Sequence, residues 1–209
     1  LHSKKPHARF TVLIVGGSLG AHGLNVRIID ALSYLSQFKE QLHFVHQTGK
    51  ADYSSIAQAF DRHSISAEVK EFIDDMSAAY ATSDLVICRA GAITLSELAV
   101  CRKASILVPF PAATDDHQAV NAQAMVDAGA AIMFREAALT GAAISQAVID
   151  LMGDQPRRMA MEKAAGAQGR PQAACEIADV LQQLCLERWG ALNGKKRNAP
   201  PLRSPRKET

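Results

Sequence analysis

The sequence is poor in residues that mark several classes of protein. Only 5% of its 209 residues are aromatic, and its four cysteines show no Cys-x-x-C spacing, which disfavours a disulfide-stapled miniprotein, a redox pair and structural zinc. The apolar runs at 11–15 and 104–110 are far shorter than the ~18 residues that suggest a membrane span. No Asp-x-Asp occurs, and both Asp-Asp pairs begin predicted helices, where capping explains them, so we expect no metal.

What the sequence does contain is a 48% share of hydrophobic residues, enough for the core of one globular domain, with or without a tail. Residues 11–186 carry 13 basic and 19 acidic side chains, whereas both ends are net basic. We interpret 1–10 as a basic segment or the remnant of an interdomain linker, 11–186 as the domain, and 187–209 as a basic, disordered tail. The alternative for this tail is binding to an anionic membrane surface, and no nucleic acid partner is expected.

Short β-rich runs alternate with longer helical patterns along the chain. We expect strands at 11–15, 42–46, 68–72, 85–88, 106–109 and 131–134. Helices are expected at 24–35, 51–62, 76–82, 94–100, 118–128, 142–152 and 156–188. Strands joined by helical crossovers predict an α/β fold, a Rossmann-like doubly wound parallel sheet whose ligands bind at the carboxyl ends of the strands.

A glycine-rich segment, Gly16-Gly17-Ser18-Leu19-Gly20-Ala21, follows the first predicted strand. It has two interpretations: a loop that lets a phosphate approach the backbone at a helix start, or a turn that merely packs a helix on a strand. A dinucleotide fingerprint would need glycine at Val15, and the second strand ends in His46 and Gln47 instead of an acidic residue. A nicotinamide or flavin oxidoreductase is therefore disfavoured, and we expect no cofactor.

The segment 89–97 follows the fourth predicted strand and opens a helix. Thr94 can offer a hydroxyl to an anion there, and Glu97, three residues later, can accept hydrogen bonds from a vicinal diol such as ribose. The same Thr-x-x-Glu spacing is also that of a capping box, which serves only the helix. Spacing alone leaves both interpretations open.

The segment 110–118 and Asn121 gather donors and acceptors suited to sugar hydroxyls after the fifth strand. His117 is a positioning or solvated residue, or else a general base. Asp115 or Asp116 is alternatively an ordinary helix N-cap.

A further segment, 71–76, leads from the third strand into a helix. Asp74 is the natural helix cap there, and Ile73 can present backbone groups to a flat ring.

These segments together resemble the C-terminal domain of glycosyltransferase family 28, which transfers N-acetylglucosamine in peptidoglycan synthesis. The matching blocks run in order from about Arg9 to Leu184 and are GGSLGA at 16–21, HQTG at 46–49, EFIDDM at 71–76 with Ala79-Tyr80, RAGAITLSE at 89–97, VPF at 108–110 and DHQxxNA at 116–122. The resemblance implies the C-terminal half of a two-domain GT-B enzyme that binds UDP-N-acetylglucosamine.

By this resemblance each block has a role at the nucleotide sugar. Ser18 and Thr94 would contact the diphosphate, Ile73 would hold uracil through its backbone, and Glu97 would bind the ribose. Gln118 would contact the N-acetylglucosamine, and the helix start around the nucleotide would be completed by Ala92, Ile93, Leu95 and Ser96. A secondary set is Gly17, Gly20, Arg89, Gly91, His117 and Asn121.

The reaction that the resemblance implies is an inverting, metal-independent transfer to the C4 hydroxyl of lipid-linked muramoyl-pentapeptide, converting lipid I to lipid II. Leu19 departs from the family, which usually has Gln there. The family's N-terminal domain has no counterpart in the 209 residues, so no catalytic residue is identified, and the acceptor would bind through that separate domain. The expected location is cytoplasmic, peripheral on the inner membrane's cytoplasmic face. The alternative function is a stand-alone nucleotide-sugar-binding or regulatory module.

Overall fold

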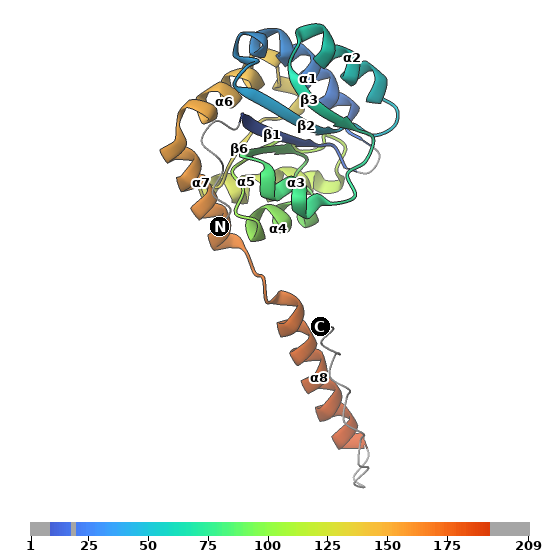
Figure 1. Ribbon diagram of the computed structural model, residues 1–209. Coiled ribbons are helices and arrows are strands. Elements are labelled where there is room, and N and C mark those ends of the chain that lie inside the picture. The colour runs from blue at the N-terminus through green and yellow to red at the C-terminus, as the bar shows by residue number, and fades with distance from the viewer. Residues whose placement is uncertain (1–8, 18–19, 193–209) are drawn as a thin grey trace, which may run out of the picture. The chain divides into compact units, whose positions relative to one another are not determined.

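A six-stranded parallel sheet forms the centre of the protein, as a computed structural model shows for residues 9–17 and 20–192 (Figure 1). Its strands are β1 Phe10–Val15, β2 Leu42–Gln47, β3 Ser66–Lys70, β4 Leu85–Cys88, β5 Ser105–Leu107 and β6 Ala131–Met133. Their order in the sheet is β3-β2-β1-β4-β5-β6. This is the doubly wound order, in which the chain direction across the sheet reverses between β1 and β4. The predicted fold class is confirmed.

Helices cover both faces of this sheet (Figure 1). One face carries α1 His22–Leu35, α2 Tyr53–His63 and α6 Gly141–Gly153. The other carries α3 Met76–Thr82, α4 Ala92–Val100 and α5 His117–Asp127, with α7 Gln155–Gln168 packed beside α4. Short 3-10 turns lie at Ser36–Phe38, Thr114–Asp116 and Glu136–Ala138.

The alternation of side chains along β1 explains why residues 12–15 are all apolar. Val12 and Ile14 lie in the core beneath α1 and α2, whereas Leu13 and Val15 lie in the core beneath α3 and α4. A parallel strand covered on both faces needs apolar residues at every position. The loop that leaves the carboxyl end of β1 therefore starts from a buried strand.

The edge strand β3 begins and ends two residues earlier than predicted, at Ser66–Lys70 instead of 68–72. Only one of its faces is well packed, and in all five residues the side chains are exposed or half-buried. Its position is set by pairing with β2, where Val45 lies opposite Glu68, rather than by an apolar pattern of its own.

The prediction of a single helix over 156–188 is wrong, because α7 ends at Gln168 and a separate helix begins at Ala173. Gly169 is extended there, with φ −73° and ψ 140°, and Pro171 disfavours helical geometry in the residue before it. The chain divides into two units between Arg170 and Pro171. The second unit contains α8 Ala173–Leu192, which extends into the segment 187–209 that we expected to be a disordered tail.

Taken alone, α8 places Ile177, Val180, Leu181 and Leu184 at the spacing of one helix face. Among the residues that the structure describes, no helix combines the length and the apolar character needed to cross a bilayer.

Candidate functional site

The glycine loop after β1 takes a conformation that only glycine adopts easily. Gly17 and Gly20 have φ of +88° and +81°, and the Gly20 N–H donates to the Gly17 carbonyl over 3.1 Å. A Cβ added to Gly20 would collide with the carbonyl oxygen of Thr48, whereas a Cβ on Gly17 would meet nothing within 4 Å. The predicted phosphate ligand Ser18, and Leu19, lie outside the described residues.

The first turn of α1 has backbone N–H groups that no described side chain caps. Its N-cap is Ala21, which has no side-chain acceptor, and the first turn contains no acidic residue. The unpaired N–H groups and the positive end of the helix dipole are available to an anion.

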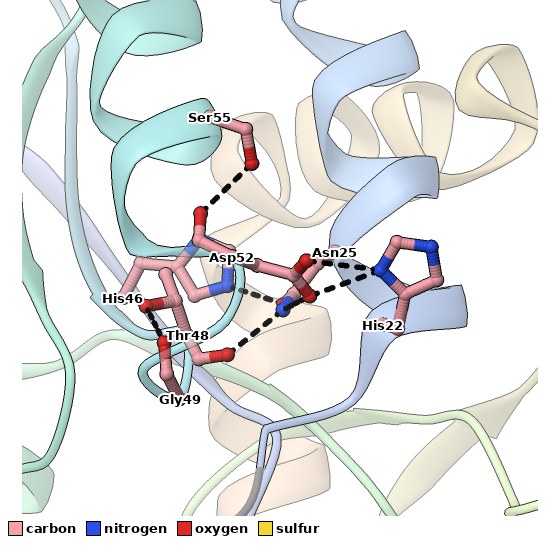
Figure 2. Close-up of polar contacts among 7 residues, drawn as sticks. All are labelled: His22, Asn25, His46, Thr48, Gly49, Asp52 and Ser55. Carbon is pink, nitrogen blue, oxygen red and sulfur yellow. Dashed lines mark hydrogen bonds and ion pairs between the residues drawn. The ribbon is translucent and has the colours of Figure 1, made fainter.

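A polar cluster next to this loop includes three buried residues, Asn25, His46 and Thr48, and Figure 2 shows its members. The Asn25 Nδ2 donates to the Thr48 carbonyl over 2.9 Å and to the Asp52 carboxylate over 2.8 Å. Its Oδ1 lies 3.0 Å from the His46 Nε2, and Asp52 is also 2.9 Å from the His22 Nδ1. The cluster thus fixes the Thr48 carbonyl against which Gly20 packs.

The protonation of this cluster follows from its contacts. Because Asn25 faces His46 with its oxygen, the imidazole Nε2 carries the proton, and its Nδ1 has no hydrogen-bond partner within the described part of the chain. Burial lowers the pKa of His46 to about 3, against the opposing effect of the Asp52 carboxylate. Burial raises the pKa of Asp52, but hydrogen bonds from Asn25 and His22 outweigh it and lower that pKa overall. At neutral pH His46 is therefore neutral and Asp52 is ionised.

The start of α4 resolves the question of the capping box. Gly91 is the N-cap and has no side-chain cap, so Thr94 lies inside the first turn instead of preceding it. A capping box would need Thr94 at the N-cap, and that alternative is wrong. Thr94 is half-buried, and the backbone N–H groups of Ala92 and Ile93 belong to an exposed, uncapped helix start.

The side chain of Glu97 is oriented by a hydrogen bond from Tyr80. Its Oε2 accepts from the Tyr80 hydroxyl over 2.9 Å, and Glu97 itself is half-buried. Burial, and then the bond to Glu97, raise the pKa of Tyr80, which therefore stays a protonated donor. One carboxylate oxygen of Glu97 remains for a ligand.

The other α4 residues predicted for the site differ in their exposure. Leu95 is buried in the core beneath α4, so only its backbone can serve a ligand. Ser96 is exposed but donates its hydroxyl to the Ala92 carbonyl over 3.0 Å. Ile93 is 78% exposed.

Gln118 joins the loops that follow β4 and β5. Its Oε1 accepts from the Ala90 N–H over 3.2 Å and from the Phe110 N–H over 3.0 Å. Asn121, one turn further along α5, is half-buried. Gln118 therefore maintains the spacing of the two loops that follow the carboxyl ends of β4 and β5.

The turn before α5 is strained at two aspartates. Asp115 and Asp116 have φ of +50° and +53°, a region that non-glycine residues rarely occupy. Asp116 occupies the N-cap position without capping, and pairs with Arg135 over 2.6 Å, so its predicted side-chain cap is wrong. The exposed His117 holds the Thr114 carbonyl through Nδ1 over 2.8 Å.

Arg89 supports the loop after β5. Its guanidinium pairs with Glu136, donates to the carbonyls of Val108 over 3.1 Å and Pro109 over 3.3 Å, and lies 5.6 Å from the Phe110 ring centre. These contacts use much of its donor capacity, which favours a structural role.

The loop after β3 presents Ile73 at the same edge, beside a cavity of about 580 Å³ between β3 and α3. The Ile73 N–H already donates to the Gln47 Oε1 over 2.9 Å, so its carbonyl is the backbone group left for a ring. Asp75, not Asp74 as predicted, caps α3 by accepting from the Ala78 N–H over 2.9 Å. Gln47 had no predicted role in the site, and only its place in the HQTG block marked it.

Comparison with known proteins decides the family. Residues 11–177 match the model of the "Glycosyltransferase family 28 C-terminal domain". The chain belongs to this family. Within the described residues, no group of three or more His, Cys, Asp or Glu side chains is arranged to hold a metal ion.

Members of this family include close relatives of the chain. It is 56% identical over 207 residues to a protein of Myxococcus xanthus named UDP-N-acetylglucosamine--N-acetylmuramyl-(pentapeptide) pyrophosphoryl-undecaprenol N-acetylglucosamine transferase, covering 99% of this chain and 53% of that protein. A protein of the same name in Anaeromyxobacter dehalogenans is 48% identical, with 98% and 54% covered. The chain spans about half the length of these curated relatives.

Solved structures agree with the family. The crystal structure of Acinetobacter baumannii MurG matches with a TM-score of 0.78 at 34% identity, over 86% of this chain and 51% of that one. A Staphylococcus aureus MnaA structure with UDP matches with a TM-score of 0.62 at 15% identity, over 93% and 50%, a likeness of fold alone.

Proposed function

We propose that this chain is the donor-binding domain of an N-acetylglucosaminyltransferase and binds UDP-N-acetylglucosamine at the carboxyl edge of its sheet. One observation carries the proposal: α1 and α4 both begin without a side-chain cap, directly after the adjacent strands β1 and β4. Because α1 and α4 cover opposite faces of the sheet, their starts flank the topological switch point between β1 and β4, where sheets of this kind bind ligands. Two sets of free N–H groups then face one diphosphate.

The neighbouring groups suit the rest of a nucleotide sugar. The carboxylate of Glu97, oriented by Tyr80, has an oxygen left for the ribose diol. The carbonyl of Ile73 suits a uracil N–H, and Gln118 and Asn121 lie on α5, where the sugar would extend. Ser18, with the Thr94 hydroxyl, completes this set in our proposal.

For the reaction, the uncapped helix start at Gly91 would stabilise the negative charge of the departing UDP. The acceptor in our proposal is lipid-linked muramoyl-pentapeptide, the substrate class in the relatives' names. We place this chemistry at the cytoplasmic face of the inner membrane, where the basic segments 1–10 and 187–209 favour an anionic surface.

Glu97→Ala tests the donor site. We expect the affinity for UDP-N-acetylglucosamine, measured by calorimetry, to fall at least tenfold, because removing a hydrogen bond to a charged group costs about 1.5–3 kcal/mol. Tyr80→Phe should weaken binding less, since the carboxylate remains. Glu40→Ala is the matched control. It removes an exposed carboxylate just before the amino end of β2, whereas the proposed site lies at the carboxyl ends of the strands. Unchanged affinity in Glu97→Ala would contradict the role of Glu97.

A second experiment separates the transferase from a stand-alone binding module. Incubated with UDP-N-acetylglucosamine and the lipid acceptor, the 209-residue chain should bind the donor but form little or no product, since it spans about half of its relatives' length. Adding the N-terminal half of such a relative should then restore transfer, measured by chromatography of the labelled lipid. Rapid transfer by the chain alone would overturn the proposed division of labour. Failure of every added N-terminal half would favour the binding module.

A further inference from the structure

The side chain of Gln47, at the end of β2, connects two loops that lie far apart in the sequence. Its Nε2 donates to the Gly17 carbonyl over 2.8 Å, in the loop after β1. Its Oε1 accepts from the Ile73 N–H over 2.9 Å, in the loop after β3. The backbone carbonyl of Gln47 also accepts from the Gly16 N–H over 3.4 Å. One residue therefore contacts both loops, with three hydrogen bonds.

The Gly17 carbonyl is the critical contact of the two. It accepts from Gln47 and also from the Gly20 N–H, which closes the glycine turn. A Cβ added to Gly17 would point into open space, with no atom within 4 Å. The Gln47 amide is thus a main restraint on a turn that leads into α1.

The chemistry of the amide explains why this position is a glutamine. Gln47 is only 3% exposed, so its main partners are the two loops and not a ligand. One planar amide supplies the acceptor that Ile73 needs and the donor that Gly17 needs. A carboxylate would supply only the acceptor, and an apolar side chain would leave the Ile73 N–H without this acceptor and the Gly17 carbonyl with only the Gly20 N–H.

We infer that Gln47 is a positioning residue that fixes the distance between the loop after β1 and the loop after β3, so that one nucleoside diphosphate can bind both loops at once. The inference rests on the proposed function, which assigns phosphate to the first loop and the base to the second. A ligand that bridges two preorganised loops avoids the cost of ordering them. A ligand that reaches only one loop gains little from their spacing.

Two variants separate the two bonds. Gln47→Met has a similar length and removes both, whereas Gln47→Glu keeps the acceptor for Ile73 and removes the donor to Gly17. Gln58→Met is the matched control, because Gln58 is exposed on α2 and contacts Ser54. The measurements are calorimetric or NMR affinities for UDP and uridine, and amide hydrogen exchange at Gly20 and Ile73. Exchange at the amides of β1 and β4 checks that each variant is folded.

We expect Gln47→Met to lower the affinity for UDP at least tenfold and that for uridine no more than about threefold. Amide exchange should accelerate at both Gly20 and Ile73 in this variant, but only at Gly20 in Gln47→Glu. Gln58→Met should match the wild type. Equal losses for UDP and uridine, or unchanged UDP affinity, would overturn the inference, as would unchanged exchange at both amides. If the wild-type chain bound no UDP, the proposed function would fail, and the exchange data would still decide whether Gln47 restrains the two loops.

Discussion

Replacing Gly20 with alanine is expected to destabilise the protein by about 2–5 kcal/mol and to abolish measurable binding of UDP-N-acetylglucosamine. The left-handed conformation costs a non-glycine residue about 1–2 kcal/mol, and overpacking adds about 1–3 kcal/mol. The collision is with backbone: the new Cβ would also lie 3.0 Å from the Thr48 carbonyl carbon and 3.1 Å from the Gly49 Cα. Because Asn25 holds that carbonyl, the loop must move instead.

Gly17→Ala is the matched control for this prediction. Gly17 has nearly the same φ, +88° against +81°, but has open space where its Cβ would lie. It should therefore show only the conformational cost of about 1–2 kcal/mol. Chemical denaturation measures both variants, and calorimetry measures their donor binding. Equal destabilisation by the two alanines would contradict the role given to the Thr48 contact.

Acidification is expected to destabilise the folded state strongly through His46. Its pKa is about 3 in the folded protein, lowered from 6.5 chiefly by burial. Between these values the unfolded chain binds a proton that the folded chain does not, so the stability present above pH 6.5 is lost as the pH falls through this window. The loss is about 1.4 kcal/mol per pH unit, or ~2 kcal/mol by about pH 5.

The measurement is the free energy of unfolding against pH in the wild type, in His46→Gln and in His117→Gln. His46→Gln should flatten the profile of unfolding free energy between about pH 6.5 and pH 5. The control His117→Gln removes an exposed imidazole and should keep the wild-type slope in this range. NMR should also show no protonation of the His46 ring above about pH 5. Identical slopes in all three proteins would be inconsistent with a buried, neutral His46.

The sequence predicts the sheet well because local patterns determine most of it. The run 85–88 is β4 to the residue, and the glycine segment 16–21 follows β1 as expected, since buried parallel strands need continuous apolar residues. β3 is misplaced because it lies at the edge, where pairing with β2 replaces burial as the determinant. The helix predicted over 156–188 fails at Gly169 and Pro171, which a periodicity count does not weigh enough.

The supporting contacts of the site could not be predicted from local patterns. Gln47 reaches Ile73 across 26 positions, and Tyr80 reaches Glu97 across 17. Nothing in the spacing of these residues specifies such pairs, because the fold brings them together after the elements have packed. The predicted functional residues thus define where we propose the site, whereas the orientation of Ile73 and Glu97 depends on Gln47 and Tyr80.

The hydrogen bonds of Gln118 also determine what this side chain can offer a ligand. The N–H groups of Ala90 and Phe110 both donate to the Gln118 Oε1. A flip of the side-chain amide would exchange its oxygen and nitrogen and would therefore lose both hydrogen bonds. The group left is an NH₂, which only donates. A ligand atom that hydrogen-bonds to Gln118 must therefore be an acceptor, because this side chain has no acceptor left for an ammonium or N–H group. The loops after β4 and β5 thus impose one hydrogen-bond polarity on this part of the proposed site.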